Sequence, residues 1–369
     1  MKKLKLTCAH AIVKHLIAQK ILIDGKKQPL FPGVFGIFGH GNVACLGQAL
    51  EENKDKLPTY RGHHEQNMAL TGIAYSRAKR RKQIFIATSS VGPGSTNLLT
   101  AAAVAMSNRI PILFLPGDTY ANRMPDPVLQ QVEHFNNPGI TANDAFKSVT
   151  RYFDRITRPE QILQSLPQAI QLMIDPADAG PACLSLCQDT QGETFDYPEE
   201  FFKERVHNIR RPKPDDFEIK KAAEKIKSCK NPIIISGGGV FYSDAMEELG
   251  NFAIKHNIPV TQTVMGYSTM KRDHSHFLGP IGGLGGKAAN NFAKKTDLAI
   301  AVGTKLADFT TGSWANFENP DFGLVSLNIT RHDANKHLAQ AVVGDAKVSL
   351  IELSNALGNW KANDDWYKK

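Results

Sequence analysis

Short apolar runs rich in Val, Ile and Leu recur along the chain, and each is followed by a Gly- or Pro-containing loop and a helix-length segment. Continuous apolar strands separated by helix-length segments are typical of parallel sheets covered on both faces. The pattern therefore predicts an α/β fold with two doubly wound parallel-sheet domains. The expected strands are 34–38, 84–90, 111–117 and 182–187 in the first half, and 232–238, 259–263, 298–303 and 324–328 in the second.

The domain boundaries are predicted from changes in composition. Residues 191–214 are charged, contain prolines and show no regular apolar period, so we interpret them as a linker. This division leaves a first domain of residues 1–190 and a second of residues 215–357. The tail 358–369 holds two tryptophans, and we expect it to dock onto something outside these domains. At the other end, MKKLKLTCAHAIVKHL predicts an amphipathic first helix.

Bulk composition narrows the class of protein. The 369 residues are 42% hydrophobic and 22% charged, and no apolar run approaches the roughly 20 residues of a membrane span. The first residues lack a secretory apolar region, so we expect a cytoplasmic protein without membrane contact. The net charge is +8, but the basic run 77–82 has no interleaved aromatic residues. It is typical of a solvated helix end, and we expect no nucleic-acid partner.

The five cysteines do not predict a metal site. Their number is odd, and Cys183 and Cys187 would share one face of a strand without a second pair to complete a zinc site. We interpret the five as free, buried thiols in a reducing compartment.

A glycine loop at 89–106, SSVGPGSTNLLTAAAVAM, is the first candidate for chemistry. Gly92, Pro93 and Gly94 let a ligand approach the backbone, and Asn97 follows in the next turn. The alternative is a tight strand-to-helix turn that only packs a helix closely. The loop is not GxGxxG and no acidic residue follows at ribose distance, which disfavours NAD.

Two further candidates are His40 and Glu65. Gly39 and His40 lie in GIFGHGN at a predicted strand end, where ligands of open α/β sheets collect. A lone histidine in a loop is more often a surface residue, although flanking glycines would let an imidazole lie against a ligand. Glu65 precedes a helix of small residues, and such a glutamate is usually favoured by the helix dipole alone.

The order of these features resembles the thiamine-diphosphate-dependent enzymes. HEQNMALTGIAYSRA is similar to the glutamate helix of the pyrimidine-binding domain, and TSSVGPGSTNLLTAAAVA is similar to its glycine loop. PIIISGGGV, ADFTTGSW and VVGDAKVSL resemble the Rossmann-like middle domain of the acetohydroxyacid-synthase branch. Within that branch, FGHGN, TRYFDRITRPEQ and VGTKLADFTTGSW resemble the hydrolases that open trihydroxycyclohexane-dione in myo-inositol breakdown.

The resemblance implies a role for each candidate. Glu65 would bond the aminopyrimidine ring of thiamine diphosphate, and burial would favour a glutamate that holds or shares a proton there. The glycine loop residues Gly92, Pro93 and Gly94, with Gly39 and Asn97, would line the cofactor. His40 and Gln131 would contact a cyclic polyol diketone. The implied reaction is C–C cleavage that opens the ring and yields an open-chain deoxy sugar acid.

The sequence departs from the family in one respect. The family binds the diphosphate and Mg²⁺ through a third domain with a GDG motif, and this sequence contains no GDG. We therefore expect half a cofactor site, no metal ligands in this chain, and a missing domain of roughly 150–200 residues. The implied partner is a second copy in a homo-oligomer or a chain carrying the diphosphate-binding domain.

Two other functions remain open at this point. One is an acetohydroxyacid-synthase-like enzyme acting on 2-oxo acids. The other is an inactive binding module that keeps the fold without the reaction.

Overall fold

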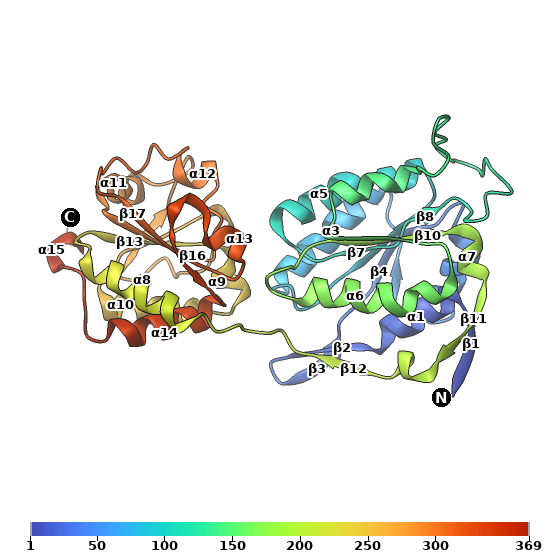
Figure 1. Ribbon diagram of the computed structural model, residues 1–369, viewed down its shortest axis with the longest axis horizontal. Coiled ribbons are helices and arrows are strands. Elements are labelled where there is room, and N and C mark those ends of the chain that lie inside the picture. Colours follow the sequence, from blue (N-terminus) through green and yellow to red (C-terminus); the bar gives the residue numbers. More distant parts are fainter. Residues whose placement is uncertain (1, 368–369) are drawn as a thin grey trace. The chain divides into compact units, whose positions relative to one another are not determined.

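A computed structural model describes residues 2–367, which fall into two compact units that divide between Ile209 and Arg210 (Figure 1). The first unit is built on a seven-stranded sheet in which every pairing is parallel. In order across the sheet the strands are β5 (Thr59–Tyr60), β4 (Val34–Ile37), β6 (Ile86–Ser89), β7 (Leu113–Phe114), β10 (Ala182–Cys187) and β8 (Gly117–Asp118), and β9 (Tyr152–Ile156) pairs with β10.

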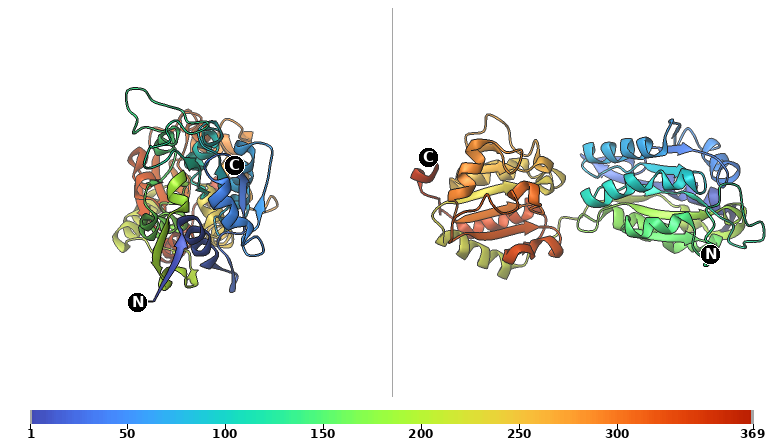
Figure 2. Two further views of the ribbon diagram at one scale, coloured as in Figure 1. Left: turned by 90° about the vertical axis from the view of Figure 1, so that its right-hand side faces the viewer. Right: turned by 90° about the horizontal axis from the view of Figure 1, so that it is seen from above.

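Helices cover both faces of this sheet. Successive strand residues point to opposite sides, and the strands carry apolar side chains on both sides. Ile86 and Leu184 pack with α1 and α6 in one apolar core, whereas Ala87 and Cys183 pack with α3 and α5 in another. Figures 1 and 2 show the two helix layers. The helices of the first unit are α1 (Cys8–Ala18), η1 (Val43–Gly47), α2 (Gln48–Glu51), α3 (Glu65–Ala78), α4 (Pro93–Thr96), α5 (Leu99–Asn108), η2 (Ala142–Ser148), η3 (Pro159–Gln161), α6 (Ile162–Ile174), α7 (Gln188–Gly192) and η4 (Glu199–Phe202).

The second unit is a six-stranded, wholly parallel sheet with apolar cores on both faces. Its strands are, in order, β15 (Phe277–Pro280), β14 (Val260–Gln262), β13 (Pro232–Ser236), β16 (Leu298–Val302), β17 (Gly323–Asn328) and β18 (Gln340–Val343). Its helices are α8 (Asp216–Ser228), α9 (Gly238–Tyr242), α10 (Met246–His256), η5 (Val264–Gly266), α11 (Lys287–Lys295), α12 (Asp308–Thr311), α13 (Arg331–Ala334), η6 (Lys336–Leu338), α14 (Ala346–Leu357) and α15 (Asp364–Tyr367).

The two doubly wound parallel sheets confirm the predicted fold class, and each of the eight expected apolar runs contains strand residues. The start of the chain differs from prediction. Lys3–Thr7 form strand β1, and the first helix begins only at Cys8. Thr7 caps that helix by accepting a hydrogen bond from the backbone N–H of His10, so the chain changes conformation there.

The segment expected to be a linker is largely folded onto the first unit. β11 (Thr194–Pro198) pairs antiparallel with β1, and β12 (Arg205–His207) joins β2 (Gln19–Ile23) and β3 (Lys26–Pro29) in a small sheet. The physical reason lies in the alternation of Phe195 and Tyr197 with polar residues, since Tyr197 is fully buried. Two alternating aromatic residues inside a charged segment are too short a pattern to indicate a strand from sequence alone.

The C-terminal tail also differs from prediction. Trp366 is 3% exposed and packs against Phe292 with ring centroids 4.7 Å apart, while Trp360 packs on the other core of the second unit. Trp366 is therefore covered by its own unit and Trp360 is half-buried against it, so the two side chains do not form a fully exposed docking segment.

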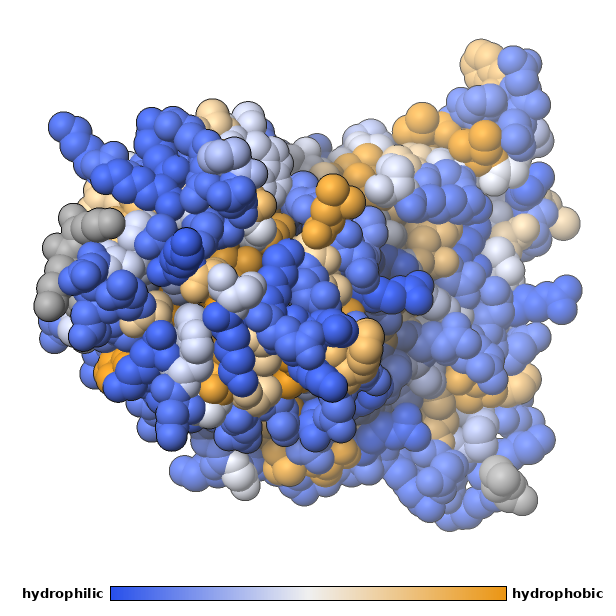
Figure 3. Space-filling view, turned by 60° about the vertical axis from the view of Figure 1, so that its left-hand side comes forward, coloured by the Kyte–Doolittle hydropathy of each residue, from blue (hydrophilic) through white to orange (hydrophobic). Residues whose placement is uncertain are grey.

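Surface and thiol properties complete the description. The face drawn in Figure 3 is mostly hydrophilic, with apolar side chains in separate patches. Within residues 2–367, no helix has the length and apolar character needed to cross a bilayer. The five cysteines are free, and Cys8, Cys183 and Cys187 are buried.

Candidate functional site

Two loops that carry predicted site residues start at the same edge of the first sheet. Strands β4 and β6 run parallel with Ile37 opposite Ser89, so the loops after them leave side by side. The backbone N–H of Val91 donates to the carbonyl of His40 at 3.1 Å. A Cβ added to Gly39 would lie 2.7 Å from Cβ of Ser90, so only glycine permits this approach. His40 itself is half-buried.

Asn42 ties the His40 loop to the sheet. It is 1% exposed, and its Nδ2 donates to Oγ1 of Thr88 at 2.8 Å and to the carbonyl of Ser89 at 2.7 Å. On the other side, Nε2 of Gln191 donates to the carbonyl of Gly41 at 2.6 Å. Buried amide groups that bond backbone carbonyls fix a loop firmly, so the position of His40 is set by its neighbours on both sides.

Glu65 is the first residue of α3 and is 9% exposed. Helix α3 packs on α5 through Ala69 and Ile73, which draws the start of α3 toward the glycine loop. Nδ2 of Asn97 donates to Oε2 of Glu65 at 3.0 Å. A Cβ added to Gly94 would lie 3.3 Å from Oε1 of Glu65 and 2.2 Å from Oγ of Ser90. The carboxyl is therefore held against the glycine loop.

The glycine loop has a conformation that requires its sequence. Gly92 has a φ of 65°, which side-chain-bearing residues rarely adopt, and a Cβ there would lie 1.9 Å from the carbonyl oxygen of Gln130. Pro93 follows as the first residue of the short helix α4, where its missing N–H has no cost. The loop thus turns tightly beneath the segment 128–132 before α4 brings Asn97 to Glu65.

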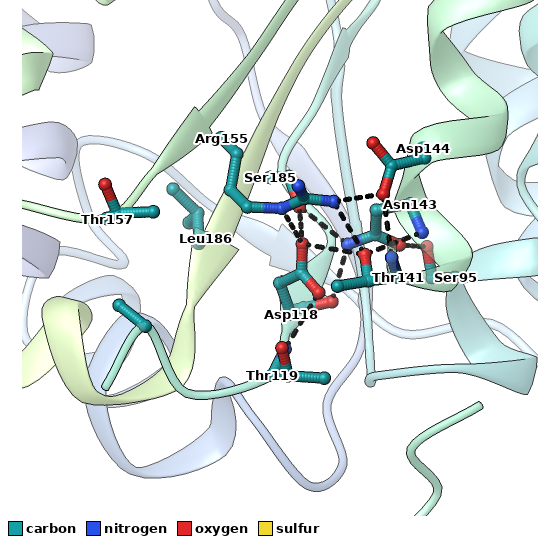
Figure 4. Close-up of polar contacts among 12 residues, drawn as sticks. Ser95, Asp118, Thr119, Thr141, Asn143, Asp144, Arg155, Thr157, Ser185 and Leu186 are labelled. Atoms are coloured by element: carbon teal, nitrogen blue, oxygen red, sulfur yellow. Dashed lines mark hydrogen bonds and ion pairs between the residues drawn. The ribbon is translucent and has the colours of Figure 1, made fainter. Parts of the chain in front are cut away.

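A buried polar network anchors α4 to the sheet (Figure 4). Oγ of Ser95 on α4 donates to Oδ1 of Asn143, which lies in η2 and is 1% exposed. Nδ2 of Asn143 in turn donates to the carbonyl of Gly117 at 2.9 Å and to Oγ of Ser185 at 2.7 Å. The helix that carries the glycine loop is therefore bonded to strand ends β8 and β10.

Arg155 completes this network by bridging two aspartates (Figure 4). Its Nε donates to Oδ2 of Asp118 at 2.9 Å, and its Nη2 donates to Oδ2 of Asp144 at 2.6 Å. Burial alone would raise the pKa of the Asp144 carboxyl, but bonds from Lys147, the Thr141 amide and Arg155 lower it to about 2. Asp118 is 1% exposed, so its charge is compensated inside the protein.

The structure brings most of the predicted residues together. Glu65, Gly94 and Asn97 are in mutual contact, and Gly39 reaches the same Ser90 that faces Gly94. Gln131 differs, because its Oε1 accepts from the backbone N–H of Val128 at 2.9 Å and so closes a local turn. The preceding residue, Gln130, is the one that lies against the glycine loop, and it does so through its backbone carbonyl.

Sequence reasoning missed the residues that hold the site in place. Ser90, Asn42 and Asn143 carried no distinct signal, although Asn42 lies within the GIFGHGN string. Arg155 and Lys147 are not among the predicted site residues, yet both bond Asp144, which follows Asn143 in η2.

The arrangement can hold a polar ring against a carboxyl. Glu65 offers a buried carboxyl, of which only Oε2 is hydrogen-bonded among residues 2–367. Over the same range no three His, Cys, Asp or Glu side chains gather in a way that could hold a metal ion. The site is thus suited to bind and exchange a proton with a neutral or basic ring nitrogen.

Comparison with known families agrees with this geometry. Residues 20–137 match the thiamine pyrophosphate enzyme N-terminal TPP binding domain, and residues 219–353 match the thiamine pyrophosphate enzyme central domain. The chain therefore belongs to the thiamine pyrophosphate enzymes and carries their N-terminal and central domains.

The individual relatives are more specific. The chain is 48% identical over 366 residues to a 3D-(3,5/4)-trihydroxycyclohexane-1,2-dione hydrolase of Clostridium tetani, which covers 99% of this chain and 57% of the relative. It is 47% identical over 360 residues to the protein of the same name from Listeria innocua. That alignment covers 98% of this chain and 56% of the relative. The chain thus spans little more than half the length of these relatives.

Proposed function

We propose that the chain supplies the pyrimidine-binding and middle domains of a thiamine-diphosphate-dependent hydrolase. The substrate would be trihydroxycyclohexane-1,2-dione, whose ring is opened by C–C cleavage to a 5-deoxy sugar acid of myo-inositol catabolism. The observation that carries the proposal is the buried Glu65 carboxyl, held by Asn97 against Gly94, with no hydrogen bond to Oε1 from residues 2–367. The names of the relatives support the substrate.

The residues present fit the aminopyrimidine half of thiamine diphosphate. A half-bonded buried carboxyl suits a ring nitrogen that shares a proton, and the glycine loop leaves no side chain on that flank. When bound, the cofactor supplies the carbanion chemistry that cleaves a C–C bond beside a carbonyl. Glu65 would hold the shared proton, while Gly92, Pro93 and Gly94 shape the wall against which the ring lies.

His40 is the proposed contact to the substrate. Its loop is fixed by Asn42 and Gln191 at the carboxyl edge of β4, beside the glycine loop. An imidazole at such a position can move a proton to or from a reacting carbonyl. Gln131 is a weaker proposal for the same role, because its amide oxygen already serves the backbone of Val128.

The remaining half of the cofactor site is proposed to lie on another domain. As in the family, a domain with a GDG motif would bind the diphosphate and Mg²⁺, either in a further segment or in a partner chain. A homo-oligomer or such a complex is supported by the loop 121–140, which lies against Gly92 and carries apolar side chains in solvent. Met124 is 89% exposed and Phe135 is 93% exposed.

The test measures turnover in the presence of the complementary domain. We would combine the chain with the C-terminal part of the Clostridium tetani relative, add thiamine diphosphate and Mg²⁺, and assay the cyclic dione and pyruvate separately. We expect turnover of the dione, and a loss of roughly 10²–10⁴-fold in Glu65→Gln. The matched control is Glu52→Gln, whose side chain is 51% exposed.

Other outcomes would select the alternatives. Turnover of pyruvate without the dione would favour an acetohydroxyacid-synthase-like enzyme. Calorimetry should detect negligible cofactor binding by the chain alone and binding after the complementary domain is added. An assembly that binds cofactor but turns over neither substrate would favour the inactive binding module.

A further inference from the structure

The hydrogen bond to Glu65 has a fixed direction. The amide nitrogen Nδ2 of Asn97 donates to Oε2 at 3.0 Å, and it is the only hydrogen bond to this carboxyl among residues 2–367. An –NH₂ group has no acceptor lone pair of this kind, so Oε2 must act as the acceptor. In a protonated carboxyl the carbonyl oxygen is the stronger acceptor, so the bond from Asn97 to Oε2 favours the form in which the proton lies on the other oxygen, Oε1.

That other oxygen, Oε1, faces the glycine loop. A Cβ at Gly94 would lie 3.3 Å from Oε1, and it would also meet Oγ of Ser90 at 2.2 Å. The absence of a side chain at Gly94 therefore leaves the flank of Oε1 open. Asn97 and Gly94 therefore affect different oxygens of the same carboxyl. Asn97 donates a hydrogen bond to Oε2, and Gly94 leaves Oε1 accessible.

Asn97 is itself held in place by the backbone. It is the C-cap of α4, and its N–H bonds the carbonyls of Pro93 and Ser95. Ser95 is bonded to the buried Asn143, so the turn that carries Asn97 is fixed to the sheet. The turn from which the Asn97 amide reaches Glu65 is thus held to the sheet by the network of Figure 4.

We propose that Asn97 is a positioning residue that keeps Oε2 of Glu65 an acceptor and so directs the exchangeable proton to Oε1. This inference rests on the proposed function, in which Oε1 faces the aminopyrimidine. It changes the role expected for Asn97 from the sequence, because its amide serves the glutamate and is not free to contact the cofactor.

The first measurement uses the chain by itself. Isotope-edited infrared spectra of protein labelled with ¹³C in the glutamate carboxyls, with Glu65→Gln subtracted, isolate the carboxyl band of Glu65. We expect this band to move in Asn97→Ala and in Asn97→Asp, because the amide donor is lost in both. The matched control is Asn108→Ala, since Nδ2 of Asn108 bonds the carbonyl of Val104 and no carboxyl.

The second measurement uses the assembly with the complementary domain. Exchange of the proton on the thiazolium carbon of bound thiamine diphosphate should slow roughly tenfold in Asn97→Ala, the loss expected for one hydrogen bond. Asn97→Asp, which keeps the size of the side chain, should slow exchange at least as much. Circular dichroism of each variant verifies the fold.

The outcomes separate this inference from the proposed function. An unmoved Glu65 band in both variants would overturn it, as would unchanged exchange in variants that still bind the cofactor. If the unsubstituted assembly does not bind thiamine diphosphate, the proposed function fails. The infrared band then still decides whether Asn97 holds Oε2.

Discussion

The Cα of Gly92 faces the carbonyl of Gln130 so closely that a Cβ would lie 1.9 Å from the carbonyl oxygen. Because the obstacle is backbone, it cannot rotate away as a side chain could. The contact joins the turn of the glycine loop to the segment 128–132. The close packing of this wall of the candidate site therefore requires glycine at position 92.

Gly92→Ala should therefore destabilise the first unit strongly. The positive φ of 65° alone costs about 1–2 kcal/mol, and overpacking against the carbonyl adds about 1–3 kcal/mol. Gly25→Ala is the matched control, because Gly25 has a φ of 73° but nothing within 4 Å of its Cβ position. Hydrogen exchange of peptides from the first unit measures both. Equal effects of the two substitutions would contradict the proposed contact.

Stability of the first unit should fall as pH decreases from about 6.5 to about 4. His15 is 5% exposed, its Nδ1 bonds the carbonyl of Phe201 at 2.7 Å, and its Nε2 faces the amide of Gln19. Burial lowers the pKa of His15 to about 4. In the unfolded chain the His15 imidazole takes up a proton below about pH 6.5, whereas in the folded protein it does so only near pH 4. Between these two pH values protonation therefore favours the unfolded state.

The loss should reach about 3 kcal/mol at pH 4, since each pKa unit corresponds to about 1.4 kcal/mol. Urea unfolding followed by far-UV circular dichroism at pH 7, 5.5 and 4.5 measures it. His15→Gln should flatten the dependence, and the same substitution at the exposed His134 controls for losing one histidine. Burial also lowers the pKa of His207, so part of the dependence should survive in His15→Gln, and only an undiminished dependence would exclude His15 as a cause.

Removing Arg155 should leave Asp118 buried without its counter-charge. We expect Arg155→Met to cost about 3–5 kcal/mol, because the penalty of an uncompensated buried charge exceeds the worth of the pair itself. Adding Asp118→Asn to that variant should restore part of the stability. The tryptophans at 314, 360 and 366 all lie in the second unit, so their fluorescence should report an unchanged transition. An Arg155→Met protein as stable as the unsubstituted one would contradict a structural role for the network.

The fold class was predictable because fully buried parallel strands leave continuous apolar runs such as ACLSLC. Edge elements were not, since a strand such as Thr194–Pro198 is apolar on one side only and lies within a charged segment. In the candidate site, Glu65 and the glycines were singled out because their order along the chain resembles a known family, and their roles stay a prediction. Asn143 and Asp118 were not, because their importance comes from contacts between residues distant in sequence, such as Asp118 with Ser185.

The last prediction concerns the C-terminal tail. The indole Nε1–H of Trp366 donates to the carbonyl of Pro232 at 2.8 Å, at the start of the strand β13 in the centre of the second sheet. The ring also packs on Phe292 of α11. Trp366→Ala removes both contacts and should cost about 3–5 kcal/mol, as for other buried tryptophans. Trp366→Phe keeps most of the packing. Its free energy of unfolding should fall by the small amount that the lost buried area predicts, and by about 1 kcal/mol more for the missing hydrogen bond.

Tryptophan fluorescence from Trp314 and Trp360 can follow urea unfolding of the second unit in both variants. Tyr267→Ala is a suitable control, because it removes another large ring from the same unit at a side chain that is 59% exposed. If the tail instead served to dock an external partner, Trp366→Ala would leave the isolated chain as stable as this control. A graded loss, larger for alanine than for phenylalanine, is expected only if residues up to Trp366 complete the core of the second unit.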